Sequence, residues 1–236
     1  MYHALGTDRI DADHAPPVAP TAFERQVRWL REAGFTAVSI GEAAATLGRG
    51  MDDGTCVAIT FDNGYLDTLT TAAPILQRYG LPFTVFVVGS YVRRPPAAGR
   101  YLDAVALREL AAVPGVTIGA HGNTHRPLTR LQAGDLADEL GASATAIADA
   151  IGARPVAMSY PHGAVDARVA RSAGEAGFTV GATSLLGVNR CGVPLLRLRR
   201  TEVTGADDDA SFRGKIRGDY DWYQLKQRLY WPVPAA

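Results

Sequence analysis

Side chains that could act in catalysis or bind a metal ion gather in three short segments of this 236-residue chain, at 60–65, 121–125 and 159–163. Each segment ends or directly follows an apolar run that has the length of a β-strand. In sheets of parallel strands, active sites form where the strands end. The sequence therefore predicts that the three segments contribute to one site.

The first segment reads Thr-Phe-Asp-Asn-Gly-Tyr and sets a carboxylate, Asp62, beside an amide, Asn63. A carboxylate at a strand end can serve as a general base. Asp, Asn and Gly also favour turns and helix N-caps, so this segment alone is equally typical of a turn.

The second segment carries His121 and His125, four residues apart after a strand. Two imidazoles at this spacing can project to the same side and chelate one divalent cation through neutral nitrogens, although such pairs also arise by chance. In the third segment, a strand stops at Tyr160-Pro161-His162-Gly163. We expect backbone amides near His162 to be free to bind an oxyanion, with a plain turn as the alternative.

Short apolar runs alternate with segments of helical periodicity along the whole chain. The alternation indicates parallel strands with helical crossovers, hence an α/β barrel or a doubly wound sheet in a single domain. A capping box is predicted from Thr21 and Glu24. The predicted strands are 2–5, 35–40, 55–62, 82–88, 116–121, 155–160, 178–183 and 195–203, and the predicted helices are 21–33, 68–79, 103–112, 133–151, 166–176 and 208–217.

The charges balance, with 24 Lys plus Arg against 24 Asp plus Glu. The overall field therefore offers no broad attraction to nucleic acid or anionic lipid, which disfavours both as partners. The chain shows neither a basic stretch followed by an apolar run at its start nor a span of about 20 apolar residues, which favours a cytoplasmic protein without a membrane span. Cys56 and Cys191 suit free thiols better than a disulfide framework.

Together the three segments resemble the motifs of the polysaccharide deacetylases (NodB homology domain, carbohydrate esterase family 4), which read Thr-Phe-Asp-Asp-Gly, His-(Ser/Thr)-x-x-His and Arg-x-Pro-Tyr-Gly or Tyr-Pro-Tyr-Gly. The resemblance covers most of the chain. It implies an α/β fold, a distorted (β/α)7–8 barrel, filling one catalytic domain over 1–236. It also implies hydrolysis of an acetyl group, more readily from nitrogen than from oxygen, on a sugar, glycan or glycosylated small molecule.

The family's site residues carry over onto matching positions of this chain. Asp62 corresponds to the general base, and Asn63, His121 and His125 correspond to the ligands of one divalent metal, usually zinc, with nickel, cobalt or manganese as other choices. The third motif matches four residues that would bind substrate or oxyanion or act beside it. These are Tyr160, Pro161, His162 and Gly163, preceded by Ser159 where many members have Arg.

Two departures from the family pattern affect the expected chemistry. Asn63 replaces a carboxylate ligand by an amide, which keeps a carbonyl oxygen but loses the negative charge, so we expect weaker metal binding. No histidine follows His162, although the family uses a late histidine as general acid. We expect His162 to take that role, with His3 as the second candidate; a buried, hydrogen-bonded imidazole is an equal alternative for His3.

Two other functions remain open from the sequence. One is a related hydrolase that cleaves a C–N bond in a small metabolite or cyclic amide, and the other is a degenerate homologue that binds sugar without cleaving it. The loops expected to select the substrate, 89–100 and 184–194, contain no sequence pattern from which the substrate can be identified. The missing export signal favours an intracellular intermediate over a cell-wall polymer as substrate.

Overall fold

Short parallel strands run through the middle of the molecule in the computed structural model, which describes residues 1–6, 15–51, 54–94 and 100–223. Five of them form one sheet in the order β3-β4-β5-β6-β7, and β1 pairs with β2 separately. All pairs are parallel. The strands are β1 Thr36–Val38, β2 Cys56–Ala58, β3 Thr60–Phe61, β4 Phe83–Val87, β5 Val116–Ala120, β6 Ala157–Ser159 and β7 Val180–Ala182.

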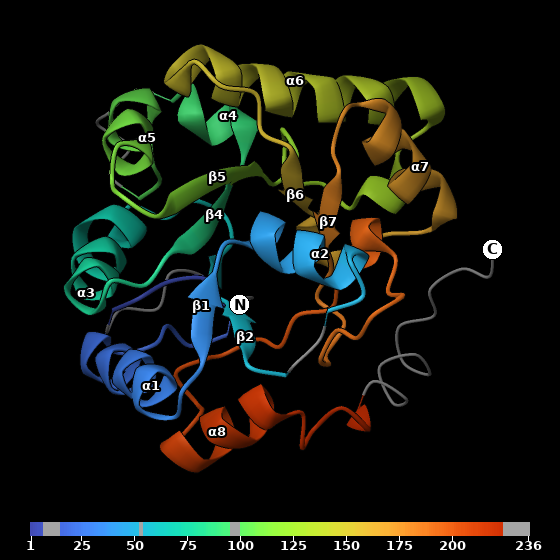
Figure 1. The fold of residues 1–236 in the computed structure, drawn as a ribbon. Helices are drawn as coiled ribbons and strands as arrows, with labels where there is room; N and C mark the ends of the chain where they lie inside the picture. The colour runs from blue at the N-terminus through green and yellow to red at the C-terminus, as the bar shows by residue number, and fades with distance from the viewer. Residues whose placement is uncertain (7–14, 52–53, 95–99, 224–236) are drawn as a thin grey trace.

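Single bridges extend the five-stranded sheet at both edges. Tyr2 pairs with Phe61 of β3, and Leu198 pairs with Ala182 of β7, both in parallel. The sheet curls, and Figure 1 shows helices spaced around its outer side. This curled parallel sheet with surrounding helices agrees with the distorted barrel that the family resemblance implies.

Helices connect the strands as expected from the alternating pattern. Asp103 and Asp166 cap two of them by accepting hydrogen bonds from amides of the first turn, and Gly80 and Gly152 end two others in the left-handed conformation. The α-helices are α1 Pro20–Glu32, α2 Ile40–Gly48, α3 Ala73–Tyr79, α4 Gly89–Val92, α5 Ala104–Ala111, α6 Ala133–Ile151, α7 Ala167–Glu175 and α8 Asp209–Arg217.

The predicted strand at 55–62 is divided between the two sheets. Residues of β2 pair with β1, whereas Thr60 and Phe61 pair with β4. Ile59 lies between them and accepts a hydrogen bond from the Thr84 amide at 2.9 Å. The chain thus passes from one sheet to the other just before Asp62.

Other sequence-based assignments also differ from the structure. The segment 195–203 is not a strand: Leu195–Arg197 is a 3-10 turn, and only Leu198 bridges to the sheet. The capping box at Thr21 does not form, because α1 begins one residue earlier, with Pro20 in its first turn and Ala19 at the N-cap. Helix α4 occupies the start of the predicted loop 89–100, and residues 95–99 of that loop lie outside the described residues.

The core fills the space between the strands and the surrounding helices. All five residues of β4 are buried, which agrees with a strand covered on both faces. Helix α6 buries Leu136, Leu140 and Ile147 against this core while Glu139 and Ser143 of the same helix are also buried. No helix of the described residues is long and apolar enough to cross a membrane.

Candidate active site

Asp62 lies immediately after β3 and is the centre of a buried polar cluster. Its side chain is 2 % exposed, and its backbone amide donates to the Tyr2 carbonyl at 3.0 Å. The Arg200 guanidinium binds both carboxylate oxygens at 2.7 Å, and the Ser159 hydroxyl donates to Oδ2 at 2.9 Å. The Nε2 atom of His121 lies 4.0 Å from the same Oδ2. The cluster therefore joins the strand ends that the sequence predicts to meet.

These neighbours keep Asp62 ionised. Burial by itself would raise the pKa of the carboxyl, but the Arg200 guanidinium, together with His121, outweighs burial and holds the pKa below its usual range. Asp62 is therefore an anion at neutral pH.

Arg200 is a site residue that the sequence reasoning missed. It lies in the segment after β7, donates from Nε to the Thr183 carbonyl at 2.9 Å, and is 7 % exposed. Its Nη2 atom also lies 2.6 Å from the Ser159 hydroxyl. Ser159 stands where the motif described above often has Arg. In this chain the Arg200 guanidinium, from a later segment, reaches the Asp62 carboxylate beside the small Ser159 side chain.

His121 is held with one nitrogen facing the site. Its Nδ1 lies 2.9 Å from the Ser159 carbonyl, which can only accept, so Nδ1 carries the hydrogen and Nε2 keeps its lone pair. Burial lowers the pKa of His121 to about 4, although Asp62 acts in the opposite direction. A neutral imidazole with a lone pair directed at the site has the form that binds a metal ion.

His125 and His162 follow on the same side of the molecule. The ring of His125 lies 5.0 Å from that of His121 and 4.7 Å from that of His162, measured between centroids. The Nε2 of His162 lies 3.2 Å from the His125 carbonyl. The structure therefore brings the three imidazoles together.

The loop between the two motif histidines is fixed by α6. The Glu139 carboxylate accepts hydrogen bonds from the amides of Asn123 and Thr124, at 2.8 and 2.6 Å, and from the Thr124 hydroxyl at 3.0 Å. The Ser143 hydroxyl donates to the Gly122 carbonyl at 2.8 Å. Neither residue was a candidate, because a polar position in a helix gives no signal of its own.

Asn63 presents an unused oxygen to the site. Its Nδ2 donates to the Tyr65 hydroxyl at 3.2 Å, which orients the amide, whereas Oδ1 is buried and has no hydrogen-bond partner within the part of the chain that the structure describes. Asn63, His125 and His162 have positive φ angles of 73°, 62° and 57°, the only non-glycine residues to do so among the described ones. Such conformations are costly and cluster at functional sites.

Asn63, His121 and His125 fit a divalent metal by their donor chemistry. The buried Asn63 oxygen has no partner and needs a cation or a donor, and His121 is a neutral imidazole whose Nε2 keeps its lone pair. Over the described ranges no group of three His, Cys, Asp or Glu side chains is placed to hold a metal, and the set named above has an amide as its third donor.

The third segment forms a tight turn against the end of β7. The Tyr160 hydroxyl donates to the Leu196 carbonyl at 2.7 Å, and the amides of Gly163 and Ala164 donate within the turn, to Tyr160 and Pro161. We expected the backbone amides near His162 to be free, but most of them are hydrogen-bonded. Within the described part of this turn, only the His162 amide has no backbone hydrogen bond.

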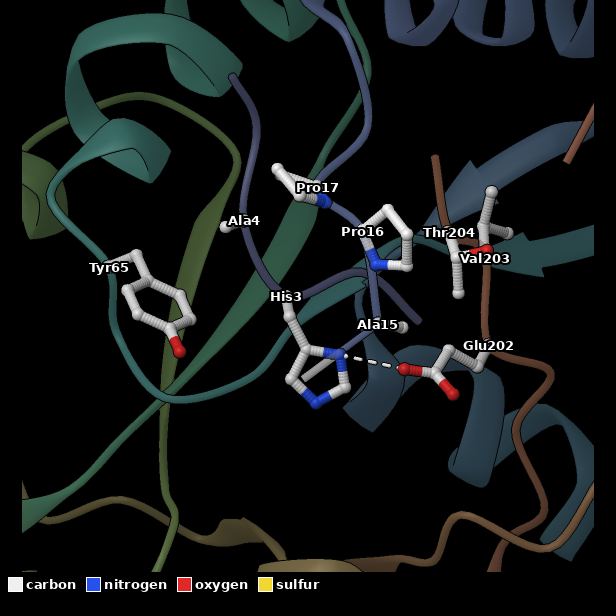
Figure 2. A pocket seen from close by; sticks show the side chains of 9 residues that line it. All are labelled: His3, Ala4, Ala15, Pro16, Pro17, Tyr65, Glu202, Val203 and Thr204. Carbon is white, nitrogen blue, oxygen red and sulfur yellow. Dashed lines mark ion pairs between the residues drawn. The ribbon is translucent and has the colours of Figure 1, made fainter. Parts of the chain in front are cut away.

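His3 lines a small pocket, which Figure 2 shows. Its Nδ1 is 3.1 Å from Glu202 Oε1, and the pocket is completed by Tyr65 and by Pro16 and Pro17. Tyr2 pairs with Phe61, the residue before Asp62, so His3 lies at the sheet edge that carries Asp62. Glu202 was also missed by sequence reasoning.

The parallel α/β fold and the carboxylate, imidazoles and amide at its strand ends define a barrel of the deacetylase type. The chain belongs to the polysaccharide deacetylase family, whose sequence profile matches residues 49–181.

Individual relatives agree with this membership. YxkH of Bacillus subtilis (strain 168), a protein named as a polysaccharide deacetylase, is 25% identical over 217 residues, covering 92% of this chain and 74% of that protein. The poly-β-1,6-N-acetyl-D-glucosamine N-deacetylase of Escherichia coli (strain K12) is 38% identical over 80 residues, 33% of this chain and 12% of that protein. The structure of Streptococcus pyogenes deacetylase PplD in complex with acetate superposes with a TM-score of 0.81 at 21% identity, covering 91% of this chain and 95% of that one, which shows the shared fold.

Proposed function

We propose that this protein is a metal-dependent hydrolase that removes an acetyl group, from nitrogen in preference to oxygen, from a sugar-containing substrate. The observation that carries the proposal is the buried Asp62 carboxylate 4.0 Å from His121, next to an amide oxygen without a partner on Asn63. Family membership and the name of the E. coli relative, an N-deacetylase, support cleavage of a bond between an acetyl group and nitrogen.

Three side chains would hold the metal: Asn63 through Oδ1, His121 through Nε2, and His125. The ion, zinc most often in this family, supplies a Lewis acid that acidifies water and polarises a carbonyl. The chain's own contribution is to orient these donors. Tyr65 fixes the Asn63 amide, the Ser159 carbonyl fixes the His121 tautomer, and Glu139 fixes the loop.

Asp62 would accept the proton of the attacking water. It is ionised because Arg200 faces it, and its orientation is set by two bonds from that guanidinium and one from Ser159. As the carboxylate passes to its protonated form, the guanidinium remains beside it, so the base is positioned before and after the proton transfer.

His3 is the better placed of the two candidates for the general acid. Nδ1 of its ring faces the Glu202 carboxylate, which orients the imidazole, as a carboxylate partner does in other acid–base sites. His162 instead has Nε2 directed at a backbone carbonyl and its ring against His125. His3 would give a proton to the departing amine, a poor leaving group that must be protonated.

The experiment is acetate release from N-acetylated chito-oligosaccharides by the purified protein. The protein is treated with a chelator, assayed, and then assayed again after addition of zinc, nickel, cobalt or manganese. We expect activity to be lost with the chelator and restored by at least one ion. A metal-loaded protein that releases no acetate from any N- or O-acetylated sugar would overturn the proposal.

A further inference from the structure

A cavity of about 430 Å³ adjoins the candidate active site and has no role in the chemistry above. It is formed between the end of β7, the turn after the third motif and the loop 184–194. Its walls are apolar except for a hydroxyl and two guanidinium groups. The lining residues are Val165, Thr183, Leu185, Val193, Pro194, Arg197 and Arg199.

Neither guanidinium on this wall is neutralised. Within the described residues, the side chains of Arg197 and Arg199 make no hydrogen bond or ion pair, although Arg199 is anchored through its backbone by Asn189 at 2.8 and 2.9 Å. The chain as a whole has no excess of positive charge, with 24 basic and 24 acidic residues. The two positive charges on one cavity are therefore a local feature and do not reflect a generally basic surface.

The cavity lies beside the residues that hold the base. The Thr183 carbonyl accepts from Arg200 Nε at 2.9 Å, and the Leu185 carbonyl accepts from the Arg200 amide at 3.0 Å. Arg200 in turn binds Asp62 through both terminal nitrogens. A single arginine residue thus links the cavity wall to the candidate base through direct hydrogen bonds.

The third motif borders the same cavity. Val165 closely follows the turn at 161–163, and a Cβ atom added to Gly163 would lie 2.9 Å from Cβ of Ser184, so the turn packs directly on the loop that forms the cavity. The segments that contribute to the cavity follow β6, which leads into the third motif, and β7, which leads to Arg200.

We propose that this cavity binds an anionic oxygen group, a carboxylate or a phosphate, carried by the acetylated substrate. This rests on the proposed function and narrows it to acidic or phosphorylated glycans. A guanidinium pairs with either group through two parallel hydrogen bonds, and the apolar walls suit the C–H faces of the attached sugar.

Binding is tested first with sugars that carry no acetyl group and cannot turn over. The wild-type protein is titrated with D-glucose, D-glucuronate and D-glucose 6-phosphate by calorimetry or by NMR shifts. We expect at least one anion to bind about 10-fold or more tightly than glucose, because a guanidinium forms charge-assisted hydrogen bonds with an anionic group and only neutral ones with a hydroxyl. Comparison of D-glucuronate with D-glucose 6-phosphate shows whether the cavity prefers a carboxylate or a phosphate. The preference for the anion over glucose should become smaller in high salt.

Variants assign the effect to the cavity. Arg197→Gln and Arg199→Gln should each reduce the preference for the anion and leave glucose binding unchanged, whereas Arg171→Gln, on the exposed face of α7, should change neither. Arg197→Lys and Arg199→Lys keep the charge and should retain part of the preference, which controls for damage to the loop. Equal affinity for all three sugars, or a preference that survives both Gln substitutions, overturns the inference.

Kinetics separate this inference from the proposed function. The ratio of kcat/KM between C6-oxidised or 6-phosphorylated chito-oligosaccharides and the unmodified oligomer should be about 10 or more. Acetate release at equal rates from charged and neutral oligomers refutes the anion site while leaving the deacetylase activity intact. No acetate from any of them, with the binding preference present, refutes the activity alone.

Discussion

The terminal nitrogens of Arg200 each lie 2.7 Å from one oxygen of the Asp62 carboxylate, although the two residues are 138 positions apart in the chain. Both side chains are buried, at 7 % and 2 % exposure. The pair therefore links the segment after β7 to the end of β3. The same ion pair stabilises the fold and holds the candidate catalytic base in place. A buried charge that loses its partner is strongly unfavourable, whereas removal of both charges is much less so.

Arg200→Met should destabilise the protein by about 3–5 kcal/mol, because it leaves the Asp62 carboxylate buried without its counter-charge. The same change should raise the pKa of Asp62, so the carboxyl is protonated over more of the pH range and activity falls most at low pH. Urea unfolding and the pH dependence of kcat/KM measure the two effects.

The double variant Arg200→Met/Asp62→Asn is the matched control. It should recover much of the stability that Arg200→Met loses, but it should remain slower than wild type by about 10² to 10⁴, the usual contribution of a positioned base. If the stability losses of the two single variants simply add in the double variant, the pair is not coupled as the structure indicates.

Asn63→Asp should tighten metal binding by about 10-fold or more, because it adds a negative charge at the position of an unused oxygen. The Tyr65 hydroxyl that now accepts from Nδ2 can rotate and donate to the new carboxylate. Calorimetric titration with zinc measures the affinity independently of activity. Asn63→Leu, of similar size without a donor atom, should bind weakly; equal affinity in all three proteins would remove Asn63 from the ligand set.

His3→Gln and His162→Gln separate the two candidates for the general acid. Loss of a general acid slows expulsion of an amine by about 10² or more. It hardly changes the rate at which a nitrophenolate is expelled, because that group leaves without a proton. His3→Gln should therefore lose activity on N-acetylated oligosaccharides and keep most of its activity on 4-nitrophenyl acetate. The opposite pattern, with the selective loss in His162→Gln, would assign the acid to His162.

The fold and the residues at the strand ends could be predicted from sequence because their signals are local. Apolar runs of strand length, and the polar clusters at 60–65 and 121–125, are each visible within a few residues. Helix α2 was missed although Ser39 and Glu42 form its capping box, since the apolar pattern at 35–40 was interpreted as a strand through Ile40.

The residues that hold the site could not be predicted in this way. Arg200 and Glu202 act on Asp62 and His3 across the whole length of the chain, and the apolar alternation of 195–203 gave only the pattern of a strand. Glu139 has the sequence signature of any polar helix position, and its function depends on which loop α6 packs against. Such contacts depend on tertiary packing, which a local pattern does not report.

Asp67 gives a pH dependence of stability that is separate from catalysis. Burial raises the pKa of Asp67 to about 7, and the hydrogen bond from the Leu5 amide offsets this only in part. The folded protein therefore binds a proton that the unfolded chain, with an ordinary Asp pKa of 3.8, has released. The Asp67 contribution to stability should fall as pH rises from about 4 to 7, and the penalty for its buried charge is fully present above pH 7.

Asp67→Asn removes that charge and keeps an oxygen that can accept from Leu5. It should stabilise the protein at pH 8 by at least about 1 kcal/mol and have little effect at pH 4.5, because each pKa unit corresponds to about 1.4 kcal/mol. Urea unfolding of wild type and variant at both pH values isolates the contribution of Asp67, since all other groups titrate alike in the two proteins. A variant that is equally stable to wild type at pH 8, or more stable only at pH 4.5, would show that the Asp67 carboxyl is ionised without penalty in the fold.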